Sequence, residues 1–226
     1  MVGFFVNTVT VTAGSIIGLL VGTRLKDKYK TIVLNSLGLV TIIIGVRMAV
    51  RSENTLILVA SLVVGGLIGE WFGIEKQLER FAEYLKRKAG SSAEQFVLGF
   101  VTASLLFCIG PMTVVGSFED GLYNKGELIY IKSLMDGFAA IALTAAFGVG
   151  VMFSAIVVFV YQGSLTFAAR YLQPFLSDSV VNEMSAAGGV IVIGIAVNVL
   201  GLAKIKVGNL ILALPLAAVI AALAIH

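Results

Sequence analysis

Apolar residues follow one another in eight long runs, separated by short segments that carry most of the charged residues. Each run holds roughly 17–22 residues, the length that an α-helix needs to cross a hydrocarbon core of about 30 Å. The pattern therefore predicts eight membrane-spanning helices, at residues 3–22, 32–50, 55–73, 95–116, 128–147, 150–168, 181–201 and 207–225. Only Gly148, Val149 and Gly150 separate the fifth run from the sixth, so an alternative in which these two form one helix stays open.

Composition supports a membrane protein. The chain has 226 residues, of which 58% are hydrophobic and 13% charged, and its mean hydropathy is +1.01. Soluble domains carry about 25% charged residues. We therefore expect one all-α transmembrane domain over residues 1–226, with the lipid bilayer as its surroundings. The net charge of +3 is small and comes from short loops, which argues against a nucleic-acid partner.

Lysine and arginine residues are unevenly shared between the two sides of the predicted membrane. Eleven lie in the first, third and seventh loops and five on the other side, so the positive-inside rule places those three loops in the cytoplasm and both termini outside. A single helix in place of spans five and six would change the distribution to ten against six. The charge bias thus favours eight spans by a small margin.

The third loop predicts an amphipathic helix over residues 74–90. Ile74, Leu78, Phe81 and Leu85 recur at helical spacing, and Lys86, Arg87 and Lys88 follow them. An apolar stripe with basic flanks is typical of a helix that lies on the cytoplasmic membrane surface. A solvated connector that ends in a charge cluster is an equally good interpretation, and a regulatory sensor is a third.

The fourth span carries Gly110 and Pro111 near its middle. Proline lacks the backbone donor and clashes with the preceding turn, so a kinked or broken helix is expected there, followed by an acidic turn at residues 119–121. Carbonyl groups freed in lipid must find other partners, and such oxygens suit a hard cation such as Na⁺. Thr102 and Ser104 lie in the same span and are candidates to line the break.

Several ionisable and amide side chains are predicted to lie inside or at the edge of the membrane. Lys132 and Asp136 are four residues apart on one face of the fifth span, where they form either a structural ion pair or a proton or cation site that Lys132 neutralises when empty. Asn7 in the first span is a further candidate, and Gln162 with Gly163 is a candidate polar break in the sixth. Glu183 at the entrance of the seventh span suits an interfacial or capping role better than a ligand role.

The chain also shows weak internal similarity. Residues 36–46 resemble residues 185–195, and the segment that starts at Asn54 resembles the one at Asn209, which predicts an inverted repeat of residues 1–73 and 150–226 around central spans at 95–147. Chance similarity between glycine-rich helices is an equal alternative. Small residues every fourth position, as at Thr10, Gly14, Gly18 and Gly22, predict close helix packing, and any such face left over would favour a homo-oligomer.

Segments spread over nearly the whole chain resemble the DUF554 family of bacterial membrane proteins. They include Gly99–Met112 with its Phe-Cys-Ile-Gly-Pro-Met run, Asp120–Leu122, Lys132–Phe138, Tyr161–Gly163, Ser185–Gly189 and Lys204–Leu210. The resemblance implies a multi-pass inner-membrane protein of prokaryotes with no settled activity. It also implies that the shared polar positions are Asp120, Lys132, Asp136, Gln162 and Asn209, of which Asp120 and Asn209 join the candidate site on this ground alone.

Two classes of function remain. The broken span, the Lys132/Asp136 pair and the predicted repeat favour a secondary transporter or ion-conducting protein for a small ion or solute, with Na⁺ or H⁺ as the coupling ion and no other cofactor. The alternative is a membrane scaffold or sensor that acts through the basic surface helix. An enzyme is not expected, because the chain lacks the motifs of intramembrane and zinc hydrolases, and Cys108 and His226 are its only cysteine and histidine.

Overall fold

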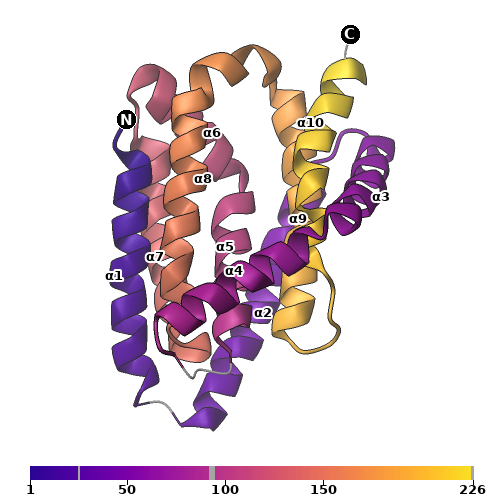
Figure 1. Ribbon diagram of the computed structural model, residues 1–226. Helices are drawn as coiled ribbons and strands as arrows, with labels where there is room; N and C mark the ends of the chain where they lie inside the picture. The colour runs from indigo at the N-terminus through magenta and orange to yellow at the C-terminus, as the bar shows by residue number, and fades with distance from the viewer. Residues whose placement is uncertain (25, 92–94, 225–226) are drawn as a thin grey trace. The chain divides into compact units, whose positions relative to one another are not determined.

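The computed structural model describes residues 1–24, 26–91 and 95–224 (Figure 1). All regular secondary structure in these ranges is helical. The elements are α1 (Gly3–Gly22), α2 (Asp27–Ala49), α3 (Thr55–Phe72), α4 (Ile74–Lys88), α5 (Phe96–Ile109), α6 (Pro111–Tyr123), α7 (Glu127–Phe147), α8 (Gly150–Leu172), η1 (Gln173–Phe175), α9 (Asp178–Val199), η2 (Val207–Leu212) and α10 (Ala213–Ala224).

The predicted all-α membrane architecture is confirmed. Within the described ranges, seven helices are long and apolar enough to cross a membrane, and the bent pair of α5 and α6 raises the number to eight if it counts as one span. The observed helices begin and end close to the predicted runs, and Gly148 separates α7 from α8 with a backbone φ of 83°. The predicted end of the last span at residue 225, and His226, lie outside the described residues.

The expected break in the fourth span lies between α5 and α6, whose axes differ by 58°. Pro111 has no N–H to donate to the carbonyl of Phe107, four residues earlier. The hydroxyl of Thr113 donates to that carbonyl instead, at 3.1 Å. The predicted acidic turn at residues 119–121 is wrong, because these residues continue α6. The helix accommodates this stretch because the Asp120 carboxylate is buried against the start of α1.

The chain divides into two compact units that interleave along the sequence. Unit 1 holds residues 1–37, 79–108 and 112–170, and unit 2 holds residues 38–78, 109–111 and 171–226. Unit 1 thus contains α1, α7 and α8 with most of α5 and α6, whereas unit 2 contains α3, α9 and α10, and α2 is divided about equally between the two units. The inverted repeat stays a prediction.

In unit 1, α1 packs along α7 in parallel, although more than one hundred residues separate them (Figure 1). A Cβ atom added at Gly14 would lie 2.3 Å from the carbonyl oxygen of Gly137, and one at Gly18 would lie 2.5 Å from that of Ile141. Glycine is required at these positions because the two backbones touch. The predicted packing face of the first span is therefore confirmed, and its partner lies in the same chain.

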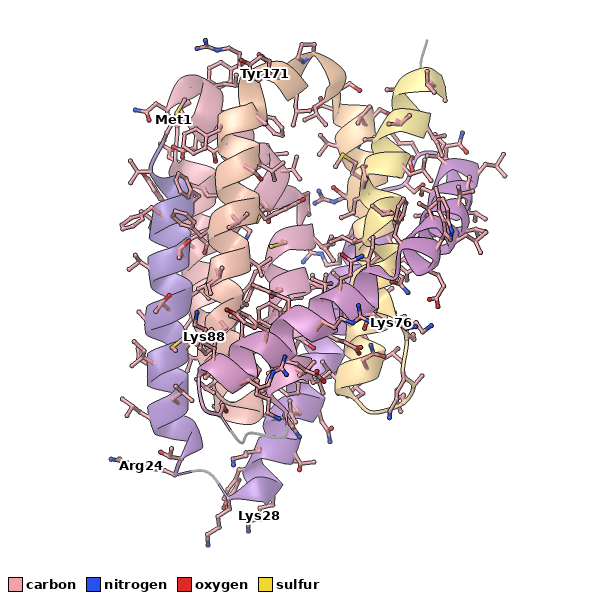
Figure 2. All side chains as sticks on the ribbon, viewed as in Figure 1. Met1, Arg24, Lys28, Lys76, Lys88 and Tyr171 are labelled. Atoms are coloured by element: carbon pink, nitrogen blue, oxygen red, sulfur yellow. The ribbon has the colours of Figure 1, made fainter. Side chains whose placement is uncertain are left out.

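The bent pair crosses unit 1 from one end to the other. Phe96, at the start of α5, packs against Gly150 at the start of α8. At the other end, Asp120 in α6 contacts Gly3 at the start of α1, and Gly121 contacts Thr166 near the end of α8. Figure 2 marks the two ends of α1 by the labels Met1, just before it, and Arg24, just after it. The contacts therefore favour one broken span over a re-entrant loop.

In unit 2, small residues also allow neighbouring helices to pack closely. Cβ atoms at Gly65 and Gly69 in α3 would lie 2.6 Å from the Ala213 nitrogen and 1.9 Å from the Asn209 carbonyl oxygen. Gly189 in α9 approaches the carbonyl of Gly45 in α2 equally closely. These glycine faces and the face predicted for the first span are thus used by contacts within the chain, and they give no support to a homo-oligomer, which stays a prediction.

The surface helix predicted over residues 74–90 exists as α4. Its basic cluster forms the last turn. Along its apolar stripe, Leu85 is buried together with Ala82, and the ring of Phe81 packs edge-on against Phe100 at 5.9 Å. Part of the stripe therefore packs on protein, and its contact with the membrane surface stays a prediction.

Candidate functional site

Four candidate residues meet inside unit 1, and we call them the polar cluster: Asn7 of α1, Lys132 and Asp136 of α7, and Gln162 of α8. The parallel contact of α1 with α7 brings Asn7 beside Asp136. The predicted polar break at Gln162 and Gly163 is wrong, because α8 continues without interruption through both residues. Gln162 therefore joins the cluster from the side of an intact helix.

Hydrogen bonds connect all four side chains. The Asn7 Nδ2 group donates to Asp136 Oδ2 at 2.9 Å and to Gln162 Oε1 at 3.0 Å. The ammonium group of Lys132 donates to the same Asp136 Oδ2 atom, one helical turn along α7. Asp136 is thus the acceptor shared by two donors from two helices.

The cluster is almost entirely shielded from the surface of the molecule. Asn7 and Gln162 have no exposed area, and the side chains of Lys132 and Asp136 are 6% and 12% exposed. Burying two charges costs several kcal/mol per ion unless they are paired and hydrogen-bonded. Here the pairing keeps the cluster neutral, while the charges remain available to a ligand that competes for either partner.

The end of α5 lies beside this cluster. The thiol of Cys108 lies within electrostatic range of Lys132 and Asp136, and Tyr161 of α8 lies within range of Cys108. Cys108 precedes the break by two residues.

Unit 1 also contains six buried polar atoms that have no partner within the described part of the protein. Two belong to the cluster itself, Asn7 Oδ1 and Gln162 Nε2. The other four are the hydroxyls of Ser15, Ser104, Ser117 and Thr144. Each such atom costs about 1–3 kcal/mol when it stays unsatisfied, so these atoms leave hydrogen-bonding capacity unused in the interior of unit 1.

Three of these four hydroxyls could not be predicted as candidates from the sequence, for a physical reason. A serine or threonine in a helix normally donates to the carbonyl four residues earlier, so its presence carries little information. Ser133 and Thr166 follow this rule, at 2.7 Å and 2.9 Å. Of the four exceptions the sequence singled out only Ser104, and nothing in the local sequence distinguishes the rest.

The remaining candidates of the broken span lie as follows. Thr102 and Ser104 are buried in α5, 4% and 2% exposed. Gly110 and Pro111 form the junction of α5 with α6 and are half-buried. Of the carbonyls that the break releases, that of Phe107 is taken by Thr113.

Asp120 does not belong to the polar cluster. Its carboxylate is 2% exposed and accepts the backbone N–H of Gly3 at 2.9 Å, so it caps the start of α1. Negative charge is favourable at this end of a helix. A structural role accounts for its burial.

Glu183 and Asn209 serve helix starts in unit 2. Glu183 accepts the backbone N–H groups of Glu53 and Asn54 at 2.7 Å and 2.9 Å, and the hydroxyl of Ser52 at 2.9 Å. Asn209 accepts the N–H of Glu75 at the start of α4 and donates to Glu70. The capping interpretation of Glu183 agrees with these contacts, and the same role accounts for Asn209.

No metal centre emerges from the described residues, since nowhere within them do three or more histidine, cysteine, aspartate or glutamate side chains come together. The polar cluster offers one carboxylate, two amides and an ammonium group. This set can bind and release a proton or a small ion or solute, and it lacks the ligands for a tightly held metal.

Comparisons with known proteins agree with the helical membrane architecture. The chain is similar to the uncharacterized membrane protein YdfK of Bacillus subtilis (strain 168), with 30% identity over 93% of this chain and 91% of that protein. It is also similar to the uncharacterized protein YqgA of Escherichia coli (strain K12), with 26% identity over 96% of this chain and 97% of that protein. No solved structure matches the chain.

The family model described as "Protein of unknown function (DUF554)" matches residues 2–222, almost the whole length of the sequence. The resemblance found in the Phe-Cys-Ile-Gly-Pro-Met run and the other segments is thereby confirmed. Together with its apolar helices and its membrane-protein relative, this makes the chain a multi-pass membrane protein of prokaryotic type. It belongs to the DUF554 family.

Proposed function

We propose that this protein moves a small ion or solute across the bilayer through unit 1, as a secondary transporter or an ion-conducting protein. The observation that carries the proposal is the polar cluster: a carboxylate, an ammonium and two amides from three helices, hydrogen-bonded to one another away from the surface. Ionisable residues inside membrane segments are costly, and they typically mark ion pathways or proton relays.

Asp136 is the centre of the proposed mechanism. In the empty site, Lys132 neutralises the carboxylate and Asn7 holds it from the neighbouring helix. A proton or Na⁺ that binds Asp136 takes over the role of Lys132 and sets the ammonium group free. Because Asn7 and Gln162 follow Asp136 through their hydrogen bonds, occupancy of the carboxylate is communicated from α7 to α1 and α8.

The test is flux into proteoliposomes, with wild type beside Asp136→Asn and with Na⁺, K⁺, H⁺ and small organic anions as solutes. Asparagine keeps an oxygen acceptor for Asn7 but cannot carry the charge, so flux is expected to vanish in a variant that still folds and inserts. Glu127→Gln is the matched control, because it makes the same chemical change at an exposed position on the same helix. Unchanged flux in Asp136→Asn would remove Asp136 from the mechanism.

The second candidate function is a membrane scaffold or sensor that acts through α4. The observation in its favour is the run of Lys86, Arg87 and Lys88 in the last turn of this helix. In that case, reversal of these three charges abolishes binding to vesicles with anionic lipid, while Asp136→Asn has no effect. We propose no enzymatic activity and no cofactor beyond a coupling ion.

A further inference from the structure

A pocket of about 410 Å³ opens in unit 1 where α1 and α7 end. Residues at the C-terminal ends of both helices line it, together with Lys30 of α2 and Gln95 before α5: Leu19, Gly22, Thr23, Lys30, Gln95 and Thr144–Gly148. Unlike the polar cluster, the pocket lies at the end of the unit that carries Arg24 and Lys28 (Figure 2). We call it the mouth pocket.

Thr144 connects this pocket with the interior. It lines the mouth pocket, yet it is only 1% exposed, and its hydroxyl is among the buried groups without a partner. A helical threonine that forgoes the carbonyl four residues earlier gives up an available hydrogen bond. The Thr144 side chain packs against Gly18 of α1, and its hydroxyl keeps an unused hydrogen-bonding capacity next to the pocket.

Two rows of side chains run from Thr144 and Ser15 back to the polar cluster. On α7, Thr144 is eight residues from Asp136, and on α1, Ser15 is eight residues from Asn7, so each row spans about 12 Å at 1.5 Å per residue. Because residues four apart lie on the same face of a helix, each row follows one face. Both rows begin with an unpartnered hydroxyl and end in the cluster.

The midpoints of the two rows are apolar and closed. Val11 on α1 and Ala140 on α7 have no exposed area, and a Cβ atom added at Gly14 would lie 3.3 Å from the Cβ of Ala140. Small and apolar residues therefore separate the hydroxyls from Asp136 in this conformation. An alternating path needs such a closed point between its mouth and its binding site.

We infer that the mouth pocket is the entrance through which a small hydrophilic solute reaches the polar cluster, with the Thr144 hydroxyl as its first contact inside the protein. This inference rests on the proposed transport function and adds the side of entry and the residues of the entrance. The basic side chain of Lys30 in the pocket wall favours anions over cations at the entrance.

The experiment measures the reactivity of one introduced cysteine with thiosulfonate reagents that are soluble in water and do not cross the bilayer. In a Cys108→Ala background, Thr144→Cys is compared with Leu143→Cys, a neighbour on the same helix that is 3% exposed and does not line the pocket. We expect Thr144→Cys to react at least about tenfold faster, the factor that corresponds to about 1.4 kcal/mol. Equal rates would overturn the inference.

The charge of the reagent provides an internal control. A sulfonate reagent is expected to react with Thr144→Cys faster than a trimethylammonium reagent, and the added variant Lys30→Gln should reduce this preference. If the sulfonate and trimethylammonium reagents label Thr144→Cys at identical rates while Lys30 is present, the entrance does not favour anions. None of these readouts depends on flux.

A second variant covers the case in which cysteine at this position disturbs folding. Thr144→Val removes the hydroxyl and nearly preserves the shape. If water or solute reaches the hydroxyl, the thermal stability of the variant does not exceed that of wild type and its flux falls. A gain in stability would show a dry, unsatisfied hydroxyl and would overturn the inference.

The outcomes separate this inference from the transport proposal. Flux that depends on Asp136 without labelling of Thr144→Cys keeps transport and rejects the entrance. Rapid labelling of Thr144→Cys without flux of any solute would support a water-filled entrance and contradict the proposed transport function.

Discussion

The two units bury polar groups in opposite ways. In unit 2, the buried carboxylate of Glu183 and the buried amide of Asn209 are bound to the backbone at the starts of α3 and α4. In unit 1, six polar atoms of the described residues are buried without a partner, and the buried ion pair of Lys132 and Asp136 is bound by the side chain of Asn7 from the neighbouring helix. Burial of polar groups alone therefore does not identify a functional site. What distinguishes unit 1 is capacity for hydrogen bonds that the fold leaves unused.

The largest effect is expected from Lys132→Met. Asp136 then loses its counterion, and loss of one partner of a buried pair costs about 3–5 kcal/mol. Thermal unfolding in detergent measures the loss. The double variant Lys132→Met with Asp136→Leu should regain most of it, and a single variant as stable as wild type would contradict the buried pair.

Glu183→Ala should be the most harmful of the capping substitutions in unit 2. It leaves two backbone N–H groups and one hydroxyl without their acceptor, which costs on the order of 1–3 kcal/mol. Glu183→Gln keeps one acceptor and should lose less. Flux per folded molecule should not change in either variant, and a selective loss of flux would make unit 2 part of the site.

Removal of single hydroxyls in unit 1 should affect stability differently, depending on whether the hydroxyl has a partner. Ser133→Ala breaks a bond to the Ile129 carbonyl and should cost about 0.5–1.5 kcal/mol, whereas Ser117→Ala removes a hydroxyl without a partner and should cost nothing or stabilise the protein. Chemical unfolding of the two variants in parallel provides the comparison. The reverse order of stability would show that Ser117 has a partner.

The smallest effect concerns pH and the loop before α3. Hydrogen bonds from Ser179 and Asn182 lower the pKa of Glu53 below its usual value. The stabilisation is therefore present above the ordinary glutamate pKa and is lost as pH falls through the lower value of the folded state. Wild type should exceed Glu53→Gln in melting temperature at about pH 7 and lose this small advantage near about pH 3. A constant difference at both pH values would contradict the assignment.

The spans could be predicted from the sequence because the bilayer imposes length and hydropathy on each of them. The same argument selected four residues of the site: Asn7, Lys132, Asp136 and Gln162. An amide or charged group within an apolar run costs free energy whether its side of the helix faces lipid or protein. Asp120 and Asn209 came only from the family resemblance. Their capping role depends on contacts with residues more than one hundred positions away.

Other features depend on helix neighbours, which local patterns do not specify. The acidic residues 119–121 favoured a turn, but the start of α1 supplies a partner for Asp120 and α6 continues. The expected break at Gln162 failed for a similar reason, because an amide with a partner on α1 needs no distortion of its own helix. The hydroxyls of Ser15, Ser117 and Thr144 were missed because only the fold shows which of them forgo their own helix.

The pairing of α1 with α7 also sets an order of assembly. The first helix enters the membrane with the glycine face of Gly14 and Gly18 uncovered and with the Asn7 amide lacking Asp136, because α7 begins only at Glu127. Its last contact, through Gln162, requires α8 as well. Until α8 has been inserted, α1 is therefore an exposed intermediate that membrane chaperones and proteases can recognise. The residues that form the site are also those by which the cell can distinguish a finished molecule from an interrupted one.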